Sequence, residues 1–424
     1  MTVSALILGS GAREHALAWK IQRSPNLKEL FCAPGNPGTA SIATNVPIPA
    51  DDAGQILAWI RSHPVDLVVV GPEAPLVKGV ADALTAAGIA VFGPSAAAAA
   101  LEGSKAFAKE VMASAGVRTA KAMVFESAAE AEAYVRRQRA VVVKADGLAA
   151  GKGVAVARGP EEAVAAIRSL SGLGDASRRL LIEERLEGEE VSVIALCDGE
   201  RFVLLPPAQD HKRVGDGDVG PNTGGMGAFA PAPFLDASGL RRVGALVIEQ
   251  VLREMARRGS PFRGALYAGL MLTASGPKVL EFNCRFGDPE AQVLVMQLRE
   301  DLLPLLLACA RGELRPRELV YETGTSICVV LAAEGYPQTP KTGDPILGLD
   351  RPLDEVQVFH AGTRRQDGQL VTSGGRVLSV CARRPHLTEA RQAVYRAIEG
   401  IRFRGMHYRR DIGLRAMASI GSSL

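Results

Sequence analysis

Strand and helix patterns alternate along the first hundred residues, and this alternation restricts the possible folds more than any other feature of the sequence. The apolar strand patterns are SALILG, ELFCAPGN, VDLVVVGPE and IAVFGPS, and a helical pattern follows each of the first three. Continuous apolar strands separated by helices are typical of a parallel sheet with helices on both faces. The first three strands run into turns with glycine or proline, at the edge where open α/β sheets bind ligands. The sequence therefore predicts a doubly wound α/β domain over residues 1–102.

The remainder of the 424 residues carries different patterns, and a chain of this length is too long for a single ordinary core. Short strands and two helical patterns between about residues 121 and 190 form one compact unit. A longer region of mixed α and β patterns follows to about residue 322. Residues 323–424 contain mainly strand patterns with one late helix, TEARQAVYRAIEG. We expect an α/β and α+β multidomain protein with a β-rich C-terminal part.

Composition narrows the range of functions. Lys and Arg number 49 against 46 Asp and Glu, which gives no sign of a basic surface for nucleic acid. The N-terminus has no basic segment ahead of its apolar run, unlike a signal peptide, and LLPLLLACA at residues 302–310 is too short to cross a bilayer. The six scattered cysteines form no C-x-x-C pair, which favours buried, reduced thiols. We expect a cytoplasmic monomer that binds neither nucleic acid nor a membrane.

The turn after the first strand, GSGAREHA, shares only part of the dinucleotide-binding fingerprint. Glu14 stands where the third glycine belongs, and the second strand ends without the acid that would bind a ribose. Nicotinamide binding is therefore disfavoured. Gly9 and Gly11 still allow a tight turn whose amides face a phosphate at a helix start, with Arg13 as a charged partner. A plain strand-to-helix turn is the alternative.

The stretch KADGLAAGKG has the residues of a phosphate-binding loop. Lys144 ends a strand pattern and would point at a phosphate from a rigid support. The loop with Gly147, Gly151, Lys152 and Gly153 can fold over phosphates and present backbone amides to them. It is not a Walker loop, because Gly153 stands where that motif has a hydroxyl for the metal. A merely exposed loop is the alternative, but the apolar LAA between glycines argues against it.

The strand pattern KVLEFNCRFGDPE supplies what the loop lacks. Glu281 and Asn283 are two residues apart and lie on the same side of a strand, and Arg285 follows at the next such position. A carboxylate and an amide oxygen suit Mg²⁺, which takes its remaining ligands from water and phosphate. The metal can therefore be held from a different strand. A chance occurrence of this pattern is the alternative.

Two further segments carry candidate contacts. In LLIEERLEGEEVSV a strand pattern stops at Glu183 and resumes after Glu190, so the crossing can offer backbone groups to an adenine edge and an acid to a ribose. A solvated acidic turn is the alternative. QDHKRVGDGDVGPNTGGMGAFAPAP has no hydrophobic period, as expected for an irregular functional loop. Its mixed charges, from Asp210 to Arg213, favour a substrate loop that holds both a carboxylate and an amine.

Together, the two-lysine glycine loop, the IEERL crossing and EFN after a strand resemble the ATP-grasp superfamily. Within it, the sequence resembles the glycinamide ribonucleotide synthetase family along essentially the whole chain, through blocks such as GSGAREHALAWK, VGPEAPLVKG, LEGSKAF and QDHKRVGDGDVGPNTGGMGA. The resemblance implies four parts: an N-terminal α/β domain (1–102), an ATP-grasp body (103–120 and 191–322), an ATP-grasp lid (121–190) and a C-terminal β-rich cap (323–424).

The resemblance also implies a reaction, in which ATP-dependent ligation joins glycine to 5-phosphoribosylamine through glycyl phosphate in purine (IMP) biosynthesis. Mg²⁺ or Mn²⁺ would be the cofactor, ATP the co-substrate, and small molecules the only partners. Such phosphoryl transfer needs positioning and charge neutralisation more than a protein nucleophile. Another ATP-grasp carboxylate–amine ligase with a different acid or amine is the main alternative, followed by a nucleotide-dependent oxidoreductase and a non-catalytic nucleotide sensor.

The site residues expected on these grounds fall into four groups. The ATP group contains Lys105, Lys144, Gly147, Gly151, Lys152, Gly153, Glu183 and Leu186 at the adenine hinge, and Glu190 at the ribose. The metal group contains Glu281 and Asn283. The phosphoribosylamine group contains Gly9, Gly11, Arg13, Glu14, Gly35, Asn36, Pro72 and Glu73. The catalytic group contains Arg285 for the transferring phosphate or the glycine carboxylate, Asp210 for the glycine ammonium, and Lys212.

Overall fold

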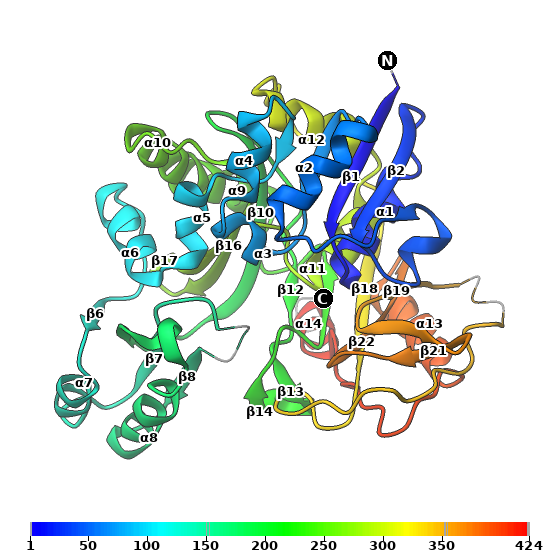
Figure 1. Ribbon diagram of the computed structural model, residues 1–424. Coiled ribbons are helices and arrows are strands. Elements are labelled where there is room, and N and C mark those ends of the chain that lie inside the picture. Colours follow the sequence, from blue (N-terminus) through cyan, green and yellow to red (C-terminus); the bar gives the residue numbers. More distant parts are fainter. Residues whose placement is uncertain (1, 150, 152, 352, 354, 422–424) are drawn as a thin grey trace.

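The computed structural model describes residues 2–149, 151, 153–351, 353 and 355–421, which form four main sheets and the helices around them (Figure 1). The predicted α/β and α+β multidomain architecture is confirmed. No helix in this described part of the chain is long and apolar enough to cross a membrane.

The N-terminal sheet is parallel, with the strand order β3-β2-β1-β4-β5. Its strands are β1 (Val3–Gly9), β2 (Leu27–Pro34), β3 (Thr44–Asn45), β4 (Leu67–Val70) and β5 (Val91–Phe92). Successive residues of β1 belong to two different hydrophobic clusters, Leu6 and Leu8 to one and Ala5 and Ile7 to the other. Both faces of β1 are therefore buried, which explains its continuous apolar sequence.

Helices cover both faces of this sheet, so the predicted doubly wound arrangement is confirmed. On one face lie α2 (Ala53–Ser62) and α4 (Val80–Ala86), whose apolar residues share a cluster with Leu6 and Leu8. On the other face α1 (Ala12–Ile21) is joined by α12 (Leu302–Arg311), a helix from much later in the chain. The short helices α3 (Glu73–Val77) and α5 (Ala96–Gly103) complete this part.

The segment expected to be a lid projects from the rest of the molecule (Figure 1). Its antiparallel sheet has the order β6-β9-β7-β8, with β6 (Ala122–Phe125), β7 (Val141–Ala145), β8 (Val154–Ala157), β9 (Leu180–Glu184), α7 (Ala128–Val135) and α8 (Pro160–Leu170). Proline at its first position and glutamates in its first turn favour the start of α8. The lid has a hydrophobic cluster of its own, whereas the other two clusters each combine residues from several parts of the chain.

The central region contains a four-stranded antiparallel sheet, with the order β11-β10-β16-β17. Its strands are β10 (Glu189–Asp198), β11 (Phe202–Leu204), β16 (Arg263–Thr273) and β17 (Gly276–Asn283). The helices around it are α6 (Lys105–Ser114), α9 (Ala237–Val243), α10 (Glu249–Arg257) and α11 (Glu290–Gln297), besides α12. The strand expected to carry the metal ligands, β17, is thus an edge strand of this sheet.

The last sheet combines strands from the central region with strands from the C-terminal region, in the order β12-β15-β18-β22-β19. Its strands are β12 (Gln209–Asp210), β15 (Gly227–Ala230), β18 (Thr325–Ala332), β19 (Gln357–His360) and β22 (Arg376–Arg384). The hairpin of β20 (Thr363–Gln366) and β21 (Gln369–Thr372), with α13 (Leu387–Ile398) and α14 (Leu414–Gly421), completes the cap. The expected boundary after residue 322 therefore runs through one sheet, and the domain boundaries stay a prediction.

The stretch expected to be an irregular loop is more ordered than its sequence indicates. Besides β12 and β15, it forms a hairpin of β13 (Arg213–Gly215) and β14 (Val219–Asn222). The buried Arg409 of the cap holds this hairpin, because its Nη1 donates to Arg213 O at 3.1 Å and to Asp218 Oδ1 at 2.7 Å. The prediction of an irregular segment was wrong here, since contacts with a distant part of the chain replace the missing apolar period.

Candidate active site

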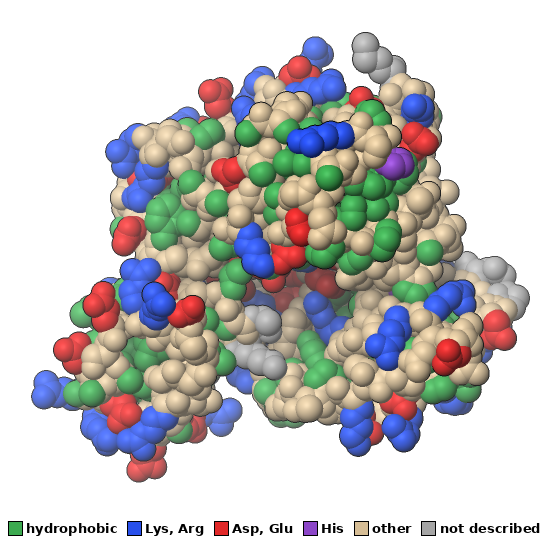
Figure 2. All heavy atoms as spheres, in the orientation of Figure 1, with side chains coloured by type: hydrophobic (Ala, Val, Ile, Leu, Met, Phe, Trp, Pro, Cys, Tyr) green, Lys and Arg blue, Asp and Glu red, His purple; other side chains and the backbone are tan. Residues whose placement is uncertain are grey.

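A cavity of about 1260 Å³ lies where the lid, the central region and the cap meet, with Arg13 and Glu73 of the N-terminal domain in its wall. In the space-filling view it is a deep hollow between two lobes, with acidic and basic side chains at its bottom (Figure 2). The lining brings together charged residues predicted from separate stretches of the sequence: Lys105, Lys144, Glu183, Glu190, Asp210, Lys212, Glu281 and Arg285.

Lys144 lies near the end of β7, as the sequence predicted, and its ammonium is held between two parts of the molecule. It donates to Leu280 O at 2.9 Å and lies 2.9 Å from Glu183 Oε2. Lys109 of α6 lies 3.0 Å from the other oxygen, Glu183 Oε1. The Glu183 side chain is only 2% exposed, so one buried carboxylate faces two ammonium groups and the trio keeps a net positive charge. Any contact of this segment with an adenine would therefore come from the backbone after β9.

Asp146 in the KADG sequence fastens the lid to the first turn of α6. Its Oδ1 accepts from Ala106 N at 2.8 Å and from Ser104 Oγ at 3.0 Å. Lys105 Nζ lies 3.2 Å from Gly147 O, and burial lowers the pKa of this lysine. Through Asp146, the KADG sequence thus places Lys105 beside the glycine loop, next to the strand that carries Lys144.

The described part of the glycine loop contacts the lid at one end and the backbone of residue 223 at the other. Gly147 N donates to Ala176 O at 2.9 Å. Gly151 has φ +78°, a conformation that favours glycine, and a Cβ there would lie 3.1 Å from Thr223 O, so a larger residue would also require a small shift of that backbone. Lys152 lies outside the described residues.

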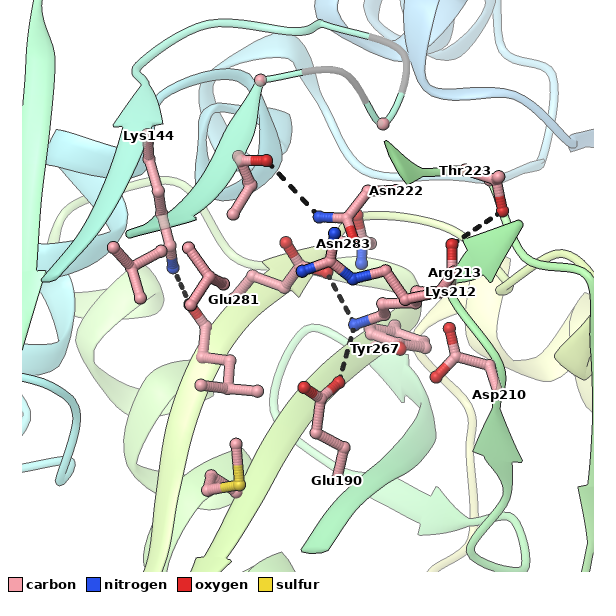
Figure 3. Close-up of a pocket in the computed structure, with 18 of the residues that line it drawn as sticks. Lys144, Glu190, Asp210, Lys212, Arg213, Asn222, Thr223, Tyr267, Glu281 and Asn283 are labelled. Carbon is pink, nitrogen blue, oxygen red and sulfur yellow. Dashed lines mark hydrogen bonds and ion pairs between the residues drawn. The ribbon is translucent and has the colours of Figure 1, made fainter. Parts of the chain in front are cut away.

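Charged groups from three strands or turns converge on Lys212 (Figure 3). Its Nζ lies 3.4 Å from Glu190 Oε2 and 3.6 Å from Glu281 Oε1. Although burial alone would lower the pKa of Lys212, the carboxylates of Asp210 and Glu190 raise it well above its ordinary value. Burial raises the pKa of Asp210 to about 8 against the influence of Lys212, and Glu290 adds to the rise. At this end of the cavity, therefore, the acidic side chains Glu190, Asp210 and Glu281 outnumber the single ammonium group of Lys212.

Glu281 and Asn283 lie at the end of β17, and both line the cavity (Figure 3). Burial alone would raise the pKa of Glu281, but Lys212, Lys144 and Lys105 lower it, so the carboxylate is ionised. In the described part of the chain, no group of three His, Cys, Asp or Glu side chains is placed to hold a metal ion. Two hard oxygen donors beside a phosphate-sized space fit Mg²⁺ or Mn²⁺ completed by phosphate and water, and not a closed protein cage.

Arg285 follows these two residues and connects the central region to the N-terminal domain. Its Nε donates to Glu73 Oε2 at 3.2 Å, and its Nη2 donates to Glu102 Oε1 at 2.8 Å and to Asn283 Oδ1 at 3.3 Å. Burial alone would raise the pKa of Glu73, but Arg285 and Arg13 lower it to about 2. The guanidinium is thus fixed beside Asn283, at the N-terminal wall of the cavity.

In the turn after β1, the Glu14 side chain accepts hydrogen bonds from neighbouring residues. Gly11 N donates to Glu14 Oε2 at 2.6 Å, and Arg13 Nε donates to Glu14 Oε1 at 2.7 Å. Gly9 has φ +126°, and a Cβ there would lie 2.6 Å from Glu14 Cγ. The Gly11 amide, which we expected to face a phosphate, is therefore already satisfied. Arg13 Nη1 donates to Phe286 O at 3.1 Å.

Asn36 also has a structural partner for each polar atom. Its Nδ2 donates to Ser10 O and to His360 O of the cap, each at 2.8 Å, and its Oδ1 accepts from Gly38 N at 2.8 Å. Among the residues expected to contact phosphoribosylamine, the structure brings two to the cavity, Arg13 and Glu73. The others are not among the described lining residues: Gly9, Gly11, Glu14, Gly35, Asn36 and Pro72. Their contact with phosphoribosylamine stays a prediction.

Sequence reasoning missed several residues that line the cavity, Glu102, Lys109, Tyr267, Asp288, Glu290 and Arg376, as well as Asp146, which holds the first turn of α6 next to it. Four of them had a visible signal, since Asp146 belongs to KADG, Asp288 and Glu290 to GDPE, and Glu102 to LEGSKAF. Lys109 had none, because its partner Glu183 lies far away in the sequence.

A lid sheet and a body sheet that enclose one cavity, with lysines on one side and a Glu-x-Asn strand on the other, define an ATP-grasp protein. Comparison with protein families agrees with this class and refines it. Residues 103–291 match the family model "Phosphoribosylglycinamide synthetase, ATP-grasp (A) domain", residues 3–102 the N domain and residues 326–415 the C domain of the same family. The chain belongs to the phosphoribosylglycinamide synthetase family.

Individual relatives cover nearly the whole chain. A protein of Caulobacter vibrioides named phosphoribosylamine–glycine ligase is 51% identical, over 98% of this chain and 99% of its own. One of Rhodopirellula baltica with the same name is 48% identical over 98% of both. The crystal structure of the Thermotoga maritima phosphoribosylamine–glycine ligase has a TM-score of 0.83 and 36% identity, over 97% of this chain and 100% of its own. Biotin carboxylase from Campylobacter jejuni, at 16% identity, TM-score 0.75 and 98% and 95% coverage, shares the fold alone.

Proposed function

We propose that this chain ligates glycine to 5-phosphoribosylamine, giving glycinamide ribonucleotide while ATP is converted to ADP and phosphate. The observation that carries the proposal is the single cavity, in which ATP-grasp lysines and a Glu-x-Asn pair lie together with an arginine anchored to the N-terminal domain. Family membership and full-length relatives named for this reaction support it. The protein is an ATP-dependent ligase of purine biosynthesis.

The first step is transfer of the γ-phosphoryl group to a glycine carboxylate oxygen, with ADP as the leaving group. Lys144 and Lys105 supply positive charge for the phosphates, and their fixed positions mean that little reorganisation is needed when charge shifts in the transition state. Glu281 and Asn283 would hold the Mg²⁺ or Mn²⁺ ion, which neutralises phosphate charge when bound. Arg285 lies beside this pair, where it can orient the glycine carboxylate or the transferring phosphate.

In the second step the nitrogen of phosphoribosylamine attacks the carbonyl carbon of glycyl phosphate, and phosphate leaves with the electron pair of the broken C–O bond. The nitrogen loses one proton as the amide forms. We assign the glycine ammonium to Asp210, at the end of the cavity where acidic side chains outnumber the ammonium group of Lys212. The phosphoribosylamine would bind at the N-terminal wall, through Arg13 and Glu73.

Finer features of the protein stay proposals. The lid would cover the ATP phosphates with residues 147–153, Leu186 would contact the adenine, and Glu190 would bind the ribose. The proposed parts are those expected from the sequence, with the lid at 121–190 and the cap from 323. The choice between Mg²⁺ and Mn²⁺, the monomeric state and the cytoplasmic location are predictions as well.

Release of ADP in the presence of each substrate combination tests the function. ADP should form with a divalent ion only when both glycine and phosphoribosylamine are present. ADP formation with a different acid or amine would select another ATP-grasp ligase. Nicotinamide-dependent absorbance changes without ATP would select an oxidoreductase, and ATP binding without any turnover would select a sensor.

Replacing Arg13 by Ala should raise the KM for phosphoribosylamine and leave that for ATP unchanged. Arg13 lies in the N-terminal wall of the cavity, whereas the proposed phosphate contacts of ATP come from the lid and α6. Hydrogen bonds to charged groups contribute about 1.5–3 kcal/mol, so the KM should rise roughly 10- to 100-fold. Steady-state kinetics with each substrate varied in turn measures this, and Arg61→Ala, an exposed site on α2, is the matched control. An equal rise in the KM for ATP would contradict the assignment.

The KM for glycine should fall as the pH rises towards 8. Burial raises the pKa of Asp210 to about 8, so in the free protein this carboxyl is largely protonated at pH 6.5. A protonated carboxyl cannot pair with an ammonium group, and binding must release its proton, which costs about tenfold in affinity per pH unit below the pKa. The glycine KM measured between pH 6.5 and 8.5 reports this. Asp210→Asn should remove the slope, and a slope that persists in that variant would assign it to another group.

A further inference from the structure

A glycine-rich segment, residues 223–225, lies between the lid loop and the cap. The backbone of Gly224 is held from the cap at both of its polar groups, since its N–H donates to Tyr336 Oη at 3.0 Å and its C=O accepts from Arg376 Nη1 at 2.7 Å. The ring of Tyr336 packs against Gly375, where a Cβ would lie 2.3 Å from Cδ2. Because Gly375 directly precedes Arg376, the cap presents both side chains to Gly224 as one unit. We call Tyr336 and Arg376 the cap clamp.

The cap clamp also reaches the central region. Arg376 Nη1 donates to Asp288 O at 2.6 Å, and its Nη2 donates to Asp288 Oδ2 at 2.9 Å. Asp288 follows the strand that carries Glu281 and Asn283. The Arg376 guanidinium therefore joins the glycine-rich segment to the turn that follows Glu281 and Asn283.

The opposite side of the glycine-rich segment meets the lid. Asn222 Nδ2 donates to Val154 O of β8 at 3.4 Å (Figure 3), and Gly151 approaches Thr223 O so closely that a Cβ would lie 3.1 Å from it. The segment has little freedom to adapt, since Gly225 has φ +114° and a Cβ there would lie 2.5 Å from Pro289 Cδ. The lid loop thus docks on a surface whose position depends on the cap.

The geometry points to Arg376 and Tyr336 as positioning residues that fix the docking surface of the lid and thereby keep water from glycyl phosphate. The inference rests on the proposed function, because it concerns that intermediate. With the clamp in place, the amine nitrogen bonds to the carbonyl carbon as phosphate leaves. Without it, a water oxygen bonds to the same carbon, the bond between that carbon and the phosphate oxygen breaks, and glycine and phosphate are released with a proton. ADP then forms without product.

The experiment measures ADP and glycinamide ribonucleotide in parallel for the full-length protein and four variants. Arg376→Met removes the guanidinium, Arg376→Lys keeps its charge, and Tyr336→Phe removes only the hydroxyl. Arg364→Met is the matched control, at an exposed position on β20 of the same cap. Thermal midpoints and the KM for ATP are recorded for each variant.

The unaltered protein and the control should form ADP and product in equal amounts. Arg376→Met and Tyr336→Phe should form ADP in excess, by roughly twofold or more, with little change in the KM for ATP, since the clamp acts on the closed lid and not on the phosphate contacts. Arg376→Lys should restore part of the coupling. The excess ADP should require glycine, because water attacks the intermediate formed from glycine.

Equal amounts of ADP and product in both clamp variants would overturn the inference, even if turnover fell, because a merely structural role lowers both amounts together. Excess ADP without glycine would also overturn it, since water would then attack ATP itself. Tyr336→Phe preserves the ring that packs on Gly375, so it decides the matter if Arg376→Met fails to fold. If the unaltered protein forms ADP when both glycine and phosphoribosylamine are left out, the proposed function fails. This result differs from the outcomes above, because they concern the clamp variants.

Discussion

Replacing Glu281 by Gln should abolish product formation while the protein stays folded. Of the two proposed metal ligands, Glu281 and Asn283, only Glu281 is charged. Its loss weakens the binding of the metal ion, which neutralises phosphate charge where the phosphoryl group is transferred. Loss of one preorganised electrostatic contact typically costs 10²–10³-fold in turnover, so a decrease of roughly 10³-fold is expected. The amide keeps the side-chain size and an oxygen near Lys212, whose Nζ lies 3.6 Å from Glu281 Oε1. Thermal unfolding should therefore change little.

ADP release at saturating ATP, with Mg²⁺ and Mn²⁺ each varied over a wide range, measures this effect. Glu200→Gln is the matched control, because Glu200 is exposed in the turn between β10 and β11. Turnover near normal in the folded Glu281→Gln variant, at a metal concentration that just saturates the unaltered protein, would exclude Glu281 from the metal site. Turnover restored only at high metal concentration would instead support it, because a weakened site fills when more metal is present.

Replacing Lys144 by Met should weaken ATP binding roughly 10- to 100-fold, since hydrogen bonds between charged groups contribute about 1.5–3 kcal/mol each. Lys144 is held on β7 by Leu280 O and Glu183, so its contact with a phosphate would exist in the ground state and appear in the dissociation constant. The same change leaves the buried Glu183 with Lys109 as its remaining ammonium partner and should lower the thermal midpoint.

A double variant separates these two effects. Lys144→Met combined with Glu183→Gln also removes the carboxylate that has lost one of its two ammonium partners, so the thermal midpoint should recover in part while ATP binding stays weak. Lys121→Met, at an exposed position, is the control. Calorimetric titration with ATP measures the dissociation constant. If the double variant also binds ATP normally, the role of Lys144 is structural and not phosphate binding.

The sequence predicted the features that depend on local pattern. The continuous apolar strands predicted a parallel sheet buried on both faces, as found for β1 with its two clusters. The period of a strand placed Glu281 and Asn283 at one cavity, and the position of Lys144 after an apolar run placed it at the end of β7.

Features that depend on distant contacts could not be predicted in this way. Lys109 lies on a helix with no unusual pattern, and its significance comes from Glu183, a residue on another sheet. The hairpin of β13 and β14 lacks an apolar period, and Arg409 from the far end of the chain stabilises it. Glu14 shows what a local motif leaves open, since its carboxylate accepts from the Gly11 amide and the sequence does not say whether a carboxylate or a phosphate binds there.

Because the lid has a separate hydrophobic cluster, the free energy needed to move the lid away from the body does not include breaking an apolar core. Because this cluster is not shared with the body, swinging the lid away leaves its apolar core intact. What is lost are polar contacts such as Lys144 to Leu280 O, Asp146 to Ser104 and Asn222 to Val154 O. When exchanged for a bond to water, each such bond changes the free energy by about 0.5–1.5 kcal/mol between neutral groups and by about 1.5–3 kcal/mol where one group is charged. The difference in free energy between the open and closed forms is therefore small. A nucleotide that binds one form more tightly than the other can reverse which form is populated.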